Sequence, residues 1–150
     1  MLISEIYHKR VDTIHENATI RDAVKEILHT EHNGLLVSND AGKVVGVLSM
    51  QDIAGATVPV QYLKNVSLAS ATYKSGFFQE IINDIKMKKV KEIMRTDFMK
   101  VTLKSHIIEV AADFLQKDLY IVPVFDDGHV IGIITRTEIK KAFADAMEIE

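Results

Sequence analysis

The chain repeats its own pattern over more than half of its length. Both copies contain a glycine, two branched apolar residues, a hydroxyl residue and an acid in one order, GVLSMQD at residues 46–52 and GIITRTE at residues 132–138. Other matching segments are ISEI with VKEI, at residues 3–6 and 90–93, and IRDA with IIEV, at residues 20–23 and 107–110. The offset changes by one residue in a loop, where insertions are best tolerated. Such repetition indicates two copies of one unit, over residues 3–56 and 90–142.

Each copy has the same predicted order of elements. A short extended piece (residues 13–15, or 99–102) precedes an amphipathic helix with apolar residues at i, i+3, i+4, i+7 and i+8. These residues are Ile20, Ala23, Val24, Ile27 and Leu28 in one copy and Ile107, Val110, Ala111, Phe114 and Leu115 in the other. Two apolar strands joined by a tight turn follow, and then a second helix, short after Met50 and longer from Arg136 to about Met147. The order β-α-β-β-α, found twice, predicts an α+β fold.

The strands also predict how the two copies are arranged. Segments such as VVGVL and VIGII are apolar at consecutive positions, which is typical of strands covered on both faces. Neither copy is large enough to bury such a sheet alone, so we expect the two to pack against each other. The predicted product is a pseudo-two-fold pair of lobes with a cleft between them.

The segment between the copies is unusually apolar for a connector. A connector of this length without structure is improbable in a compact domain, and residues 78–85 have helical spacing. We therefore predict three parts: a first repeat at residues 1–56, a partly helical linker at residues 57–89 and a second repeat at residues 90–150. The linker is expected to pack onto the module or to complete a homodimer.

Composition and motifs exclude several classes of function. There is no cysteine, the net charge is −3, and no run of about 20 apolar residues is present, so we expect no thiol chemistry, nucleic-acid partner or membrane span. No Gly-rich phosphate loop or nucleophile elbow is found. His29 and His32 lack an evident third ligand, which favours a solvated helix end over a metal site. We expect a cytoplasmic protein that is not an enzyme and has no catalytic residues, no metal and no required cofactor.

Taken together, the repeated motifs resemble those of the cystathionine β-synthase (CBS) domain, which occurs in tandem as the Bateman module. VKEIMRTD at residues 90–97, IVPVFDDG at residues 121–128 and GIIT at residues 132–135 are similar to the opening, central and closing motifs of that family. The first copy departs from the pattern at two positions: Leu36 stands where proline is usual, and Tyr7 where methionine is usual.

The resemblance implies a stand-alone regulatory module that senses an adenosine-containing ligand in the cleft between the repeats. AMP, ADP, ATP and S-adenosylmethionine are the family's usual ligands, and energy sensing is a usual role. Such modules commonly pair as homodimers. Because no output domain is attached in this sequence, the signal would pass to a separate protein partner, which is unidentified. The alternative is a structural or assembly module that has lost nucleotide binding.

The resemblance also assigns site residues. In the family, a Ser/Thr-x-x-Asp sequence before the last helix presents a hydroxyl and helix-start amides to phosphate and a carboxylate to the ribose. Ser49 and Asp52 match it, whereas Glu138, three residues after Thr135, is one methylene longer. We therefore favour the first of two expected sites. Its residues are Thr13, Ile14, His15, Asn33, Gly34, Leu35, Ser49 and Asp52, and those of the second are Lys100, Val101, Thr102, Tyr120, Ile121, Val122, Thr135 and Glu138.

Two of these assignments have a structural alternative. Ser49-x-x-Asp52 before a helix is also the pattern of an N-cap with a first-turn acid, and the two roles do not exclude each other. His15 is equally consistent with a half-buried polar residue on an edge strand.

Overall fold

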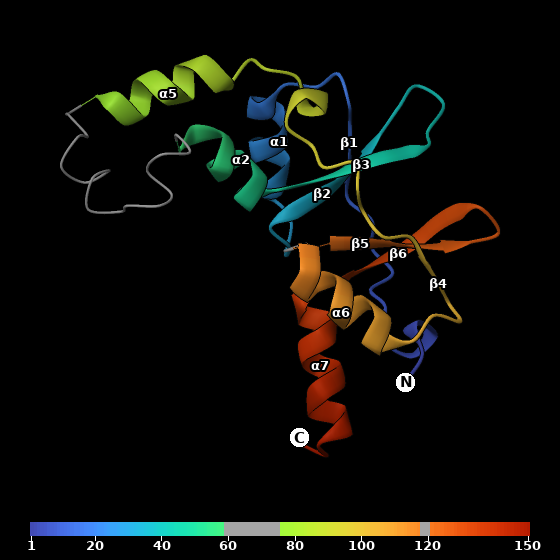
Figure 1. Cartoon of the computed structure of the whole chain (residues 1–150). Helices are drawn as coiled ribbons and strands as arrows, with labels where there is room; N and C mark the ends of the chain where they lie inside the picture. Colours follow the sequence, from blue (N-terminus) through green and yellow to red (C-terminus); the bar gives the residue numbers. More distant parts are fainter. Residues whose placement is uncertain (59–75, 118–120) are drawn as a thin grey trace.

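The computed structural model describes residues 1–58, 76–117 and 121–150, and these form two lobes, each built on a three-stranded sheet (Figure 1). The elements from the first part of the chain are η1 (Ile3–Glu5), β1 (Thr13–His15), α1 (Ile20–Ile27), β2 (Gly34–Ser38), β3 (Val44–Ser49) and α2 (Met50–Thr57). Those from the second part are α5 (Phe77–Ile85), η2 (Val90–Glu92), β4 (Val101–Thr102), α6 (Ile107–Lys117), β5 (Ile121–Asp126), β6 (His129–Thr135) and α7 (Arg136–Ala146).

The two sheets have identical topology. In each, the first strand pairs in parallel with the second, and the second pairs in antiparallel with the third. The turn of the second hairpin places Asp127 and Gly128 at φ 51° and 78°, the left-handed conformation that a tight turn between twisted strands needs. The predicted α+β fold with two β-α-β-β-α units is confirmed.

The sheets pack against each other through a shared core. Its buried residues come from both repeats: Leu36, Val44, Val47, Ile121 and Ile133. Each sheet also packs its own helix on the other face, so both faces are covered, as the consecutive apolar positions predict. Leu28 and Leu115 are the fifth residues of the two predicted apolar stripes. They are 79% and 87% exposed, so the prediction that they belong to the packed face of each helix is wrong.

Leu36 shows why the first copy can lack the family's proline. The backbone N–H of Leu36 donates to the carbonyl of Asp12 at 3.0 Å, and the side chain is fully buried between the sheets. Proline has no N–H to donate, so it could not make this bond. The departure from the family pattern therefore keeps a hydrogen bond to the segment before β1.

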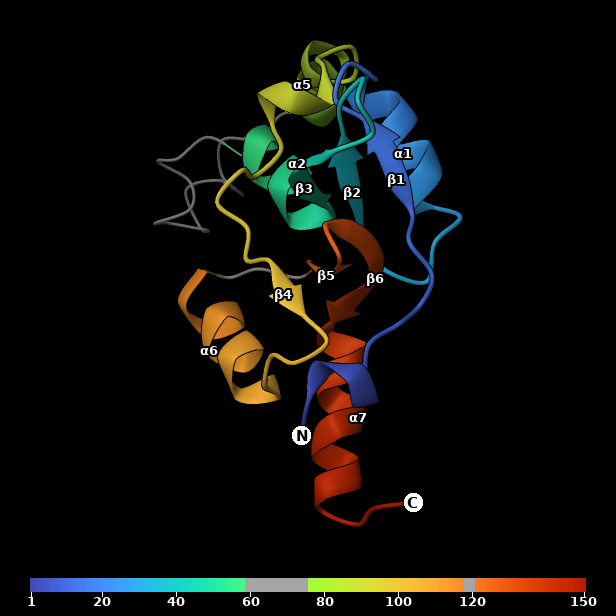
Figure 2. The same cartoon turned by 90° about the vertical axis from the view of Figure 1, so that its right-hand side faces the viewer.

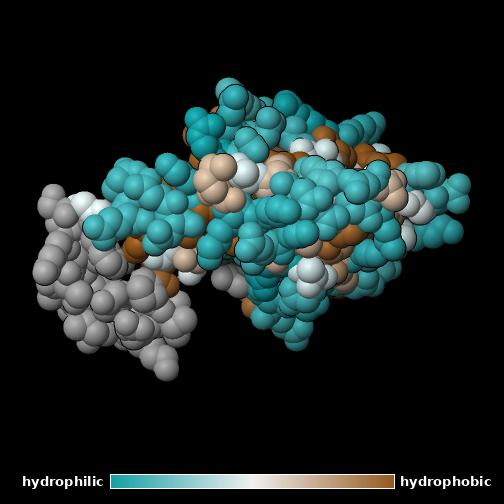
Figure 3. Space-filling model, turned by 90° about the horizontal axis from the view of Figure 1, so that it is seen from above, coloured by the Kyte–Doolittle hydropathy of each residue, from teal (hydrophilic) through white to brown (hydrophobic). Residues whose placement is uncertain are grey.

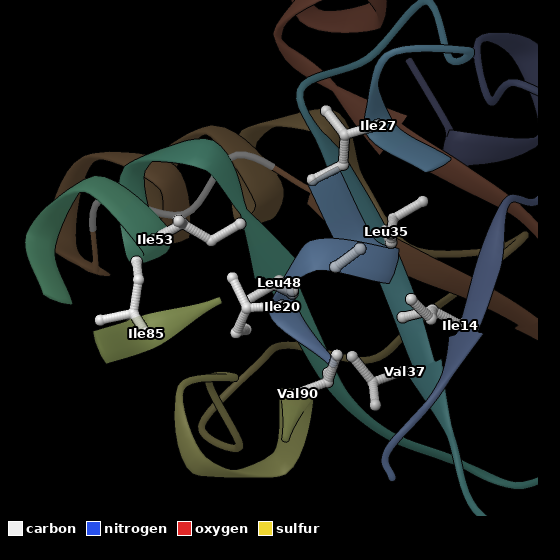
Figure 4. Close-up of a cluster of buried hydrophobic side chains, with 10 residues drawn as sticks. Ile14, Ile20, Ile27, Leu35, Val37, Leu48, Ile53, Ile85 and Val90 are labelled. Atoms are coloured by element: carbon white, nitrogen blue, oxygen red, sulfur yellow. The ribbon is translucent and has the colours of Figure 1, made fainter. Parts of the chain in front are cut away.

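The two repeats exchange their opening turns. Ile3 in η1 is fully buried in the core of the second lobe, and its N–H donates to Ser105 at 2.9 Å. Val90 in η2 is fully buried in the core of the first lobe, where its N–H donates to Ala18 at 2.8 Å (Figure 4). Figure 2 shows η1 beside α7, at the far end of the molecule from α1. Each lobe therefore contains residues from both repeats, although the repeats are separate in sequence.

The predicted helix at residues 78–85 is present as α5, which runs beside α2 (Figure 1). Its Ile85 is buried in the core of the first lobe (Figure 4). Residues 59–75 of the predicted linker lie outside the described residues. Most of the face seen in Figure 3 is hydrophilic, with hydrophobic residues in smaller patches. Within residues 1–58, 76–117 and 121–150, no helix is long and apolar enough to cross a membrane.

Candidate ligand site at the starts of α2 and α7

Ser49 and Asp52 form a reciprocal cap at the start of α2. The backbone N–H and the Oγ of Ser49 both donate to Oδ2 of Asp52 at 2.9 Å, and the N–H of Asp52 donates back to Oγ at 3.3 Å. Ser49 pairs with Gly34 across the hairpin, and the N–H of Met50 donates to Asn33 at 2.8 Å. The start of β2 and the residue before it therefore hold the cap in place.

The cap uses only one oxygen of the Asp52 carboxylate. Both bonds from Ser49 end on Oδ2, and Oδ1 has no hydrogen-bond partner among the residues that the structure describes. The side chain is only partly buried. An ionised carboxylate can accept at both oxygens, so Asp52 can cap α2 and accept from a ligand hydroxyl at the same time.

Thr135 and Glu138 form the matching cap at the start of α7, but here both side chains are buried. The N–H and the Oγ1 of Thr135 donate to Oε2 of Glu138 at 2.7 and 2.5 Å, and Glu138 is only 4% exposed. The imidazoles of His8 and His32 lie beside this carboxylate, with ring centroids 5.1 Å apart in an edge-to-face arrangement. The position equivalent to Asp52 is thus enclosed by side chains.

Both helix starts border one small polar pocket of about 100 Å³. Residues from both repeats line it: Glu31, His32, Asn33, Gln51, Thr135, Arg136 and Thr137. Gln51 and Thr137 occupy equivalent positions in the two repeats, one residue before Asp52 and Glu138. Amides at helix starts favour negative charge, so this pocket suits an anionic group.

Four other predicted residues line a second, larger cleft at the hairpin end of the sheets. Its volume is about 870 Å³, and Thr13, Lys100, Val101 and Thr102 are among its lining residues. The ammonium of Lys100 lies 5.8 and 5.7 Å from the ring centroids of Phe98 and Phe125. Strand register explains why Thr13 lies away from Ser49. Thr13 pairs with Leu36 and β1 runs parallel to β2, so β1 continues away from the end of β2 where Gly34 pairs with Ser49.

The remaining predicted residues do not present side chains to either space. Ile14, Leu35, Ile121 and Val122 are buried in hydrophobic cores, so only their backbone groups are available to a ligand. His15 contacts Asp40 at 2.7 Å and accepts from the N–H of Asn17 at 3.0 Å, near the β2–β3 turn. Tyr120 lies outside the described residues. Thr13 thus borders the larger cleft, His15 lies near the β2–β3 turn, and Ser49 lies at the start of α2.

The sequence analysis missed His8 and Arg95, which occupy equivalent positions two residues after the matching ISEI and VKEI segments. Each forms a backbone bridge to the last strand of the opposite repeat, His8 to Ile133 and Arg95 to Val47. Arg95 also donates from Nη2 to the carbonyl of Lys117 at 2.6 Å. The internal repeat could have indicated these two residues, because each polar residue lies two positions after one of the two matching segments.

Comparisons with known proteins agree with this architecture. The uncharacterized protein MJ1426 of Methanocaldococcus jannaschii is 26% identical over 155 residues, which cover 95% of this chain and 90% of that protein. An L-aspartate semialdehyde sulfurtransferase of the same organism is 25% identical over 143 residues, and these span only 23% of the enzyme.

Solved structures are similar over nearly the whole chain. The CBS domain pair of protein MJ0100, in complex with 5′-methylthioadenosine and S-adenosyl-L-methionine, has a TM-score of 0.69 and 26% identity, covering 95% of this chain and 99% of that one. The CBS-domain containing protein ATU1752 from Agrobacterium tumefaciens has a TM-score of 0.72 at 15% identity, covering 95% and 92%. The CBS domain family model matches residues 3–58 and 90–145. The chain therefore belongs to the CBS domain family and carries two CBS domains in tandem.

Proposed function

We propose that this chain is a regulatory module that binds an adenosine-containing ligand at the start of α2 and transmits the binding to a separate protein. In this proposal Asp52 accepts from the ribose hydroxyls. Ser49 and the helix-start amides bind the polar end of the ligand. In this proposal the chain acts as a regulator and not as a catalyst.

One observation carries the proposal: Oδ2 of Asp52 completes the cap of α2, while Oδ1 has no partner among the described residues. A half-buried carboxylate held in a fixed orientation by two donors is preorganised to accept from a further hydroxyl. The MJ0100 domain pair, which is similar over the whole fold, was solved with two adenosine-containing ligands. That likeness supports the ligand class.

The second repeat is not proposed to bind ribose in the same way. Glu138 is 4% exposed, and two histidines lie beside its carboxylate. A ribose would have to displace these side chains and the hydrogen bonds of a buried cap, whereas Asp52 needs no such rearrangement. We therefore propose one adenosine site per chain.

The fold offers a route for the signal. Each lobe contains the opening turn of the opposite repeat, so a ligand that orders the start of α2 favours one relative position of the lobes. Leu28 and Leu115, at equivalent positions, line exposed apolar grooves against α2–α5 and α7. These two grooves are the surfaces that we propose for homodimer or partner contacts.

Thermal unfolding with AMP, ADP, ATP, NAD, S-adenosylmethionine and 5′-methylthioadenosine tests the proposal. A ligand at 100 times its Kd stabilises the folded state by about 2.7 kcal/mol, which raises Tm by several degrees in a chain of this size. Asp52→Asn should reduce the shift to about half or less, since tenfold weaker binding leaves about 1.4 kcal/mol of stabilisation at the same ligand concentration. Asp145→Asn, at an exposed acid on α7, should leave it unchanged. No shift with any of the six compounds contradicts adenosine sensing.

A second candidate is a structural or assembly module without a ligand. The enclosed position of Glu138 favours it, because one of the two expected sites is already filled by protein side chains. In that case no nucleotide changes Tm, while mutation of Leu28 or Leu115 to aspartate still disrupts self-association or partner binding. The response of Tm to the six compounds separates the two candidates, and size-exclusion chromatography with light scattering measures the effect of the leucine variants.

A further inference from the structure

His8, His32 and Glu138 bring three metal-binding side chains together from distant parts of the chain. One ligand atom from each lies within 4.8 Å of the others. His8 belongs to the segment before β1, His32 to the loop before β2, and Glu138 to the first turn of α7. The sequence analysis predicted no metal because it paired His32 only with its neighbour His29, which is exposed.

The hydrogen bonds around Thr135 determine the state of His32. The hydroxyl of Thr135 gives its single proton to Glu138, so toward His32 Nδ1, at 3.4 Å, it can act only as an acceptor. In the neutral tautomer with the proton on Nδ1, which this contact favours, Nε2 of His32 carries a lone pair. That Nε2 is buried and has no hydrogen-bond partner within the described structure. A buried lone pair without a donor is costly unless something binds it.

The backbone holds the three side chains in place. His8 exchanges two hydrogen bonds of 2.9 Å with Ile133, so the segment carrying it is fixed to β6. Thr135 holds Glu138 through two donors, and also contacts His32. Histidine ligands whose second nitrogen is hydrogen-bonded, and carboxylates held by donors, are typical of the surroundings of a protein metal site.

We propose that His8, His32 and Glu138 bind a divalent transition-metal ion, with Zn²⁺ as the best-fitting ion. Two imidazole nitrogens and one carboxylate form a common ligand set for Zn²⁺, with an open fourth position. Ligand atoms about 2.1 Å from the metal in tetrahedral geometry lie about 3.4 Å apart, so ion binding requires the cluster to contract by at most about 1.4 Å. His32 also lines the small polar pocket, so the fourth position can face an anionic ligand or water.

Such a site ties together three segments that belong to both repeats. The metal ion joins the opening segment and a first-repeat loop to α7 of the second repeat, and so fixes the relative position of the two lobes. This role is distinct from adenosine binding at Asp52, which belongs to the same repeat as His8 and His32 but lies at the start of α2. It also gives a physical reason for glutamate at position 138, since its longer side chain reaches the two imidazoles.

Equilibrium dialysis against Zn²⁺ followed by elemental analysis tests the site in the full chain. We expect one Zn²⁺ per chain, with binding weakened about tenfold or more in His8→Gln, His32→Gln and Glu138→Gln. Cobalt substitution gives a second readout, because a four-coordinate site produces intense visible absorption bands that these variants should lose. Circular dichroism without metal verifies that each variant is folded.

His29→Gln is the matched control, because it removes an exposed histidine three residues from His32. We expect it to bind Zn²⁺ like the wild type. Thr135→Val should weaken binding about 10- to 100-fold without removing any ligand, because it removes the hydroxyl contacts to His32 and Glu138. Absence of stoichiometric Zn²⁺ in the folded wild type overturns the proposal, as does an equal loss in His29→Gln and His32→Gln.

Discussion

Gly132 lies directly against the backbone carbonyl of His8, and a Cβ at this glycine would collide with that oxygen and with the ring of Tyr7. The same stretch is joined by two backbone hydrogen bonds of 2.9 Å between His8 and Ile133. Gly132→Ala must therefore push the opening segment away from β6. We expect it to destabilise the fold by about 1–3 kcal/mol, as overpacking does, measured by urea unfolding. Unchanged stability would contradict this close approach.

Gly46 is the equivalent glycine in the first repeat and has a similar neighbour. An added Cβ there would lie 2.6 Å from Sδ of Met94 and 2.9 Å from the carbonyl oxygen of Arg95. The methionine can move aside, which leaves only the carbonyl oxygen in the way. At Gly132 a backbone oxygen and the ring of Tyr7 both collide, so Gly46→Ala should destabilise the protein less than Gly132→Ala.

Gly55 in α2 is the control for both glycine variants, since among the described residues no atom outside the surrounding helix backbone lies within 4 Å of an added Cβ. Gly55→Ala should stabilise the chain by about 0.8–1 kcal/mol through helix propensity. The expected rank of urea midpoints is therefore Gly55→Ala, wild type, Gly46→Ala, Gly132→Ala. Any order that places Gly132→Ala above the wild type is inconsistent with the structure.

The exchange of opening turns predicts which lobe responds to a mutation in η1. Ile3→Ala leaves a cavity in the core of the second lobe and should cost about 2–5 kcal/mol. Amide hydrogen exchange should accelerate in β4–β6, although residue 3 belongs to the first repeat. Ile108→Ala, at a side chain that is 71% exposed, should change stability by less than about 0.5 kcal/mol. Acceleration confined to β1–β3 after Ile3→Ala would rule out the exchange.

Asp22 provides a test of pH dependence. Hydrogen bonds from the backbone and side chain of Thr19 lower the pKa of Asp22 below its usual value. A lowered pKa means that the ionised form stabilises the folded state, so this contribution is present above the ordinary carboxyl pKa and is lost as pH falls through the lowered value. Titration of the Asp22 carboxyl by NMR should show the lowered pKa, and Thr19→Val should move it back up. Because valine keeps the backbone donor, which is the larger cause, the pKa should rise only part of the way, and an unchanged pKa in Thr19→Val would refute the contribution of the Thr19 hydroxyl.

Thr19 and Asp22 also show what the hydroxyl-x-x-acid pattern establishes by itself. They form the same reciprocal cap at α1, with bonds of 3.2 and 3.1 Å, and the side chain of Asp22 is exposed. The pattern forms a cap at three described helices, whereas Thr13 and Glu16 have the same spacing at strand β1 and form no helix cap. Ligand binding depends on the surroundings of the acid, which are open at Asp52 and closed at Glu138.

The sequence predicted the fold because its signals are local and occur twice. The apolar stripe of each helix, the apolar strands and the Asp127-Gly128 turn each depend on neighbouring residues, and the repeat confirmed each of them. The exchange of η1 and η2 was not predictable in this way, because matching turns do not indicate which lobe they pack on.

The candidate site was only partly predictable for the same reason. Ser49 and Asp52 are three residues apart, so helix geometry alone brings them together. The placement of Thr13 and His15 depends on the register of β1 against β2, which apolar strands do not specify from sequence. The cluster of His8, His32 and Glu138 requires three long-range contacts, and no local spacing indicates it.

Isothermal titration calorimetry of wild type, Asp52→Asn and Glu138→Gln with S-adenosylmethionine and with each adenine nucleotide tests the central claim most directly. The account predicts that at least one ligand binds with one site per chain, that Asp52→Asn weakens it by about tenfold or more through loss of a charge-assisted hydrogen bond, and that Glu138→Gln leaves its affinity unchanged. Equal binding by wild type and Asp52→Asn, or a loss seen only in Glu138→Gln, would contradict it.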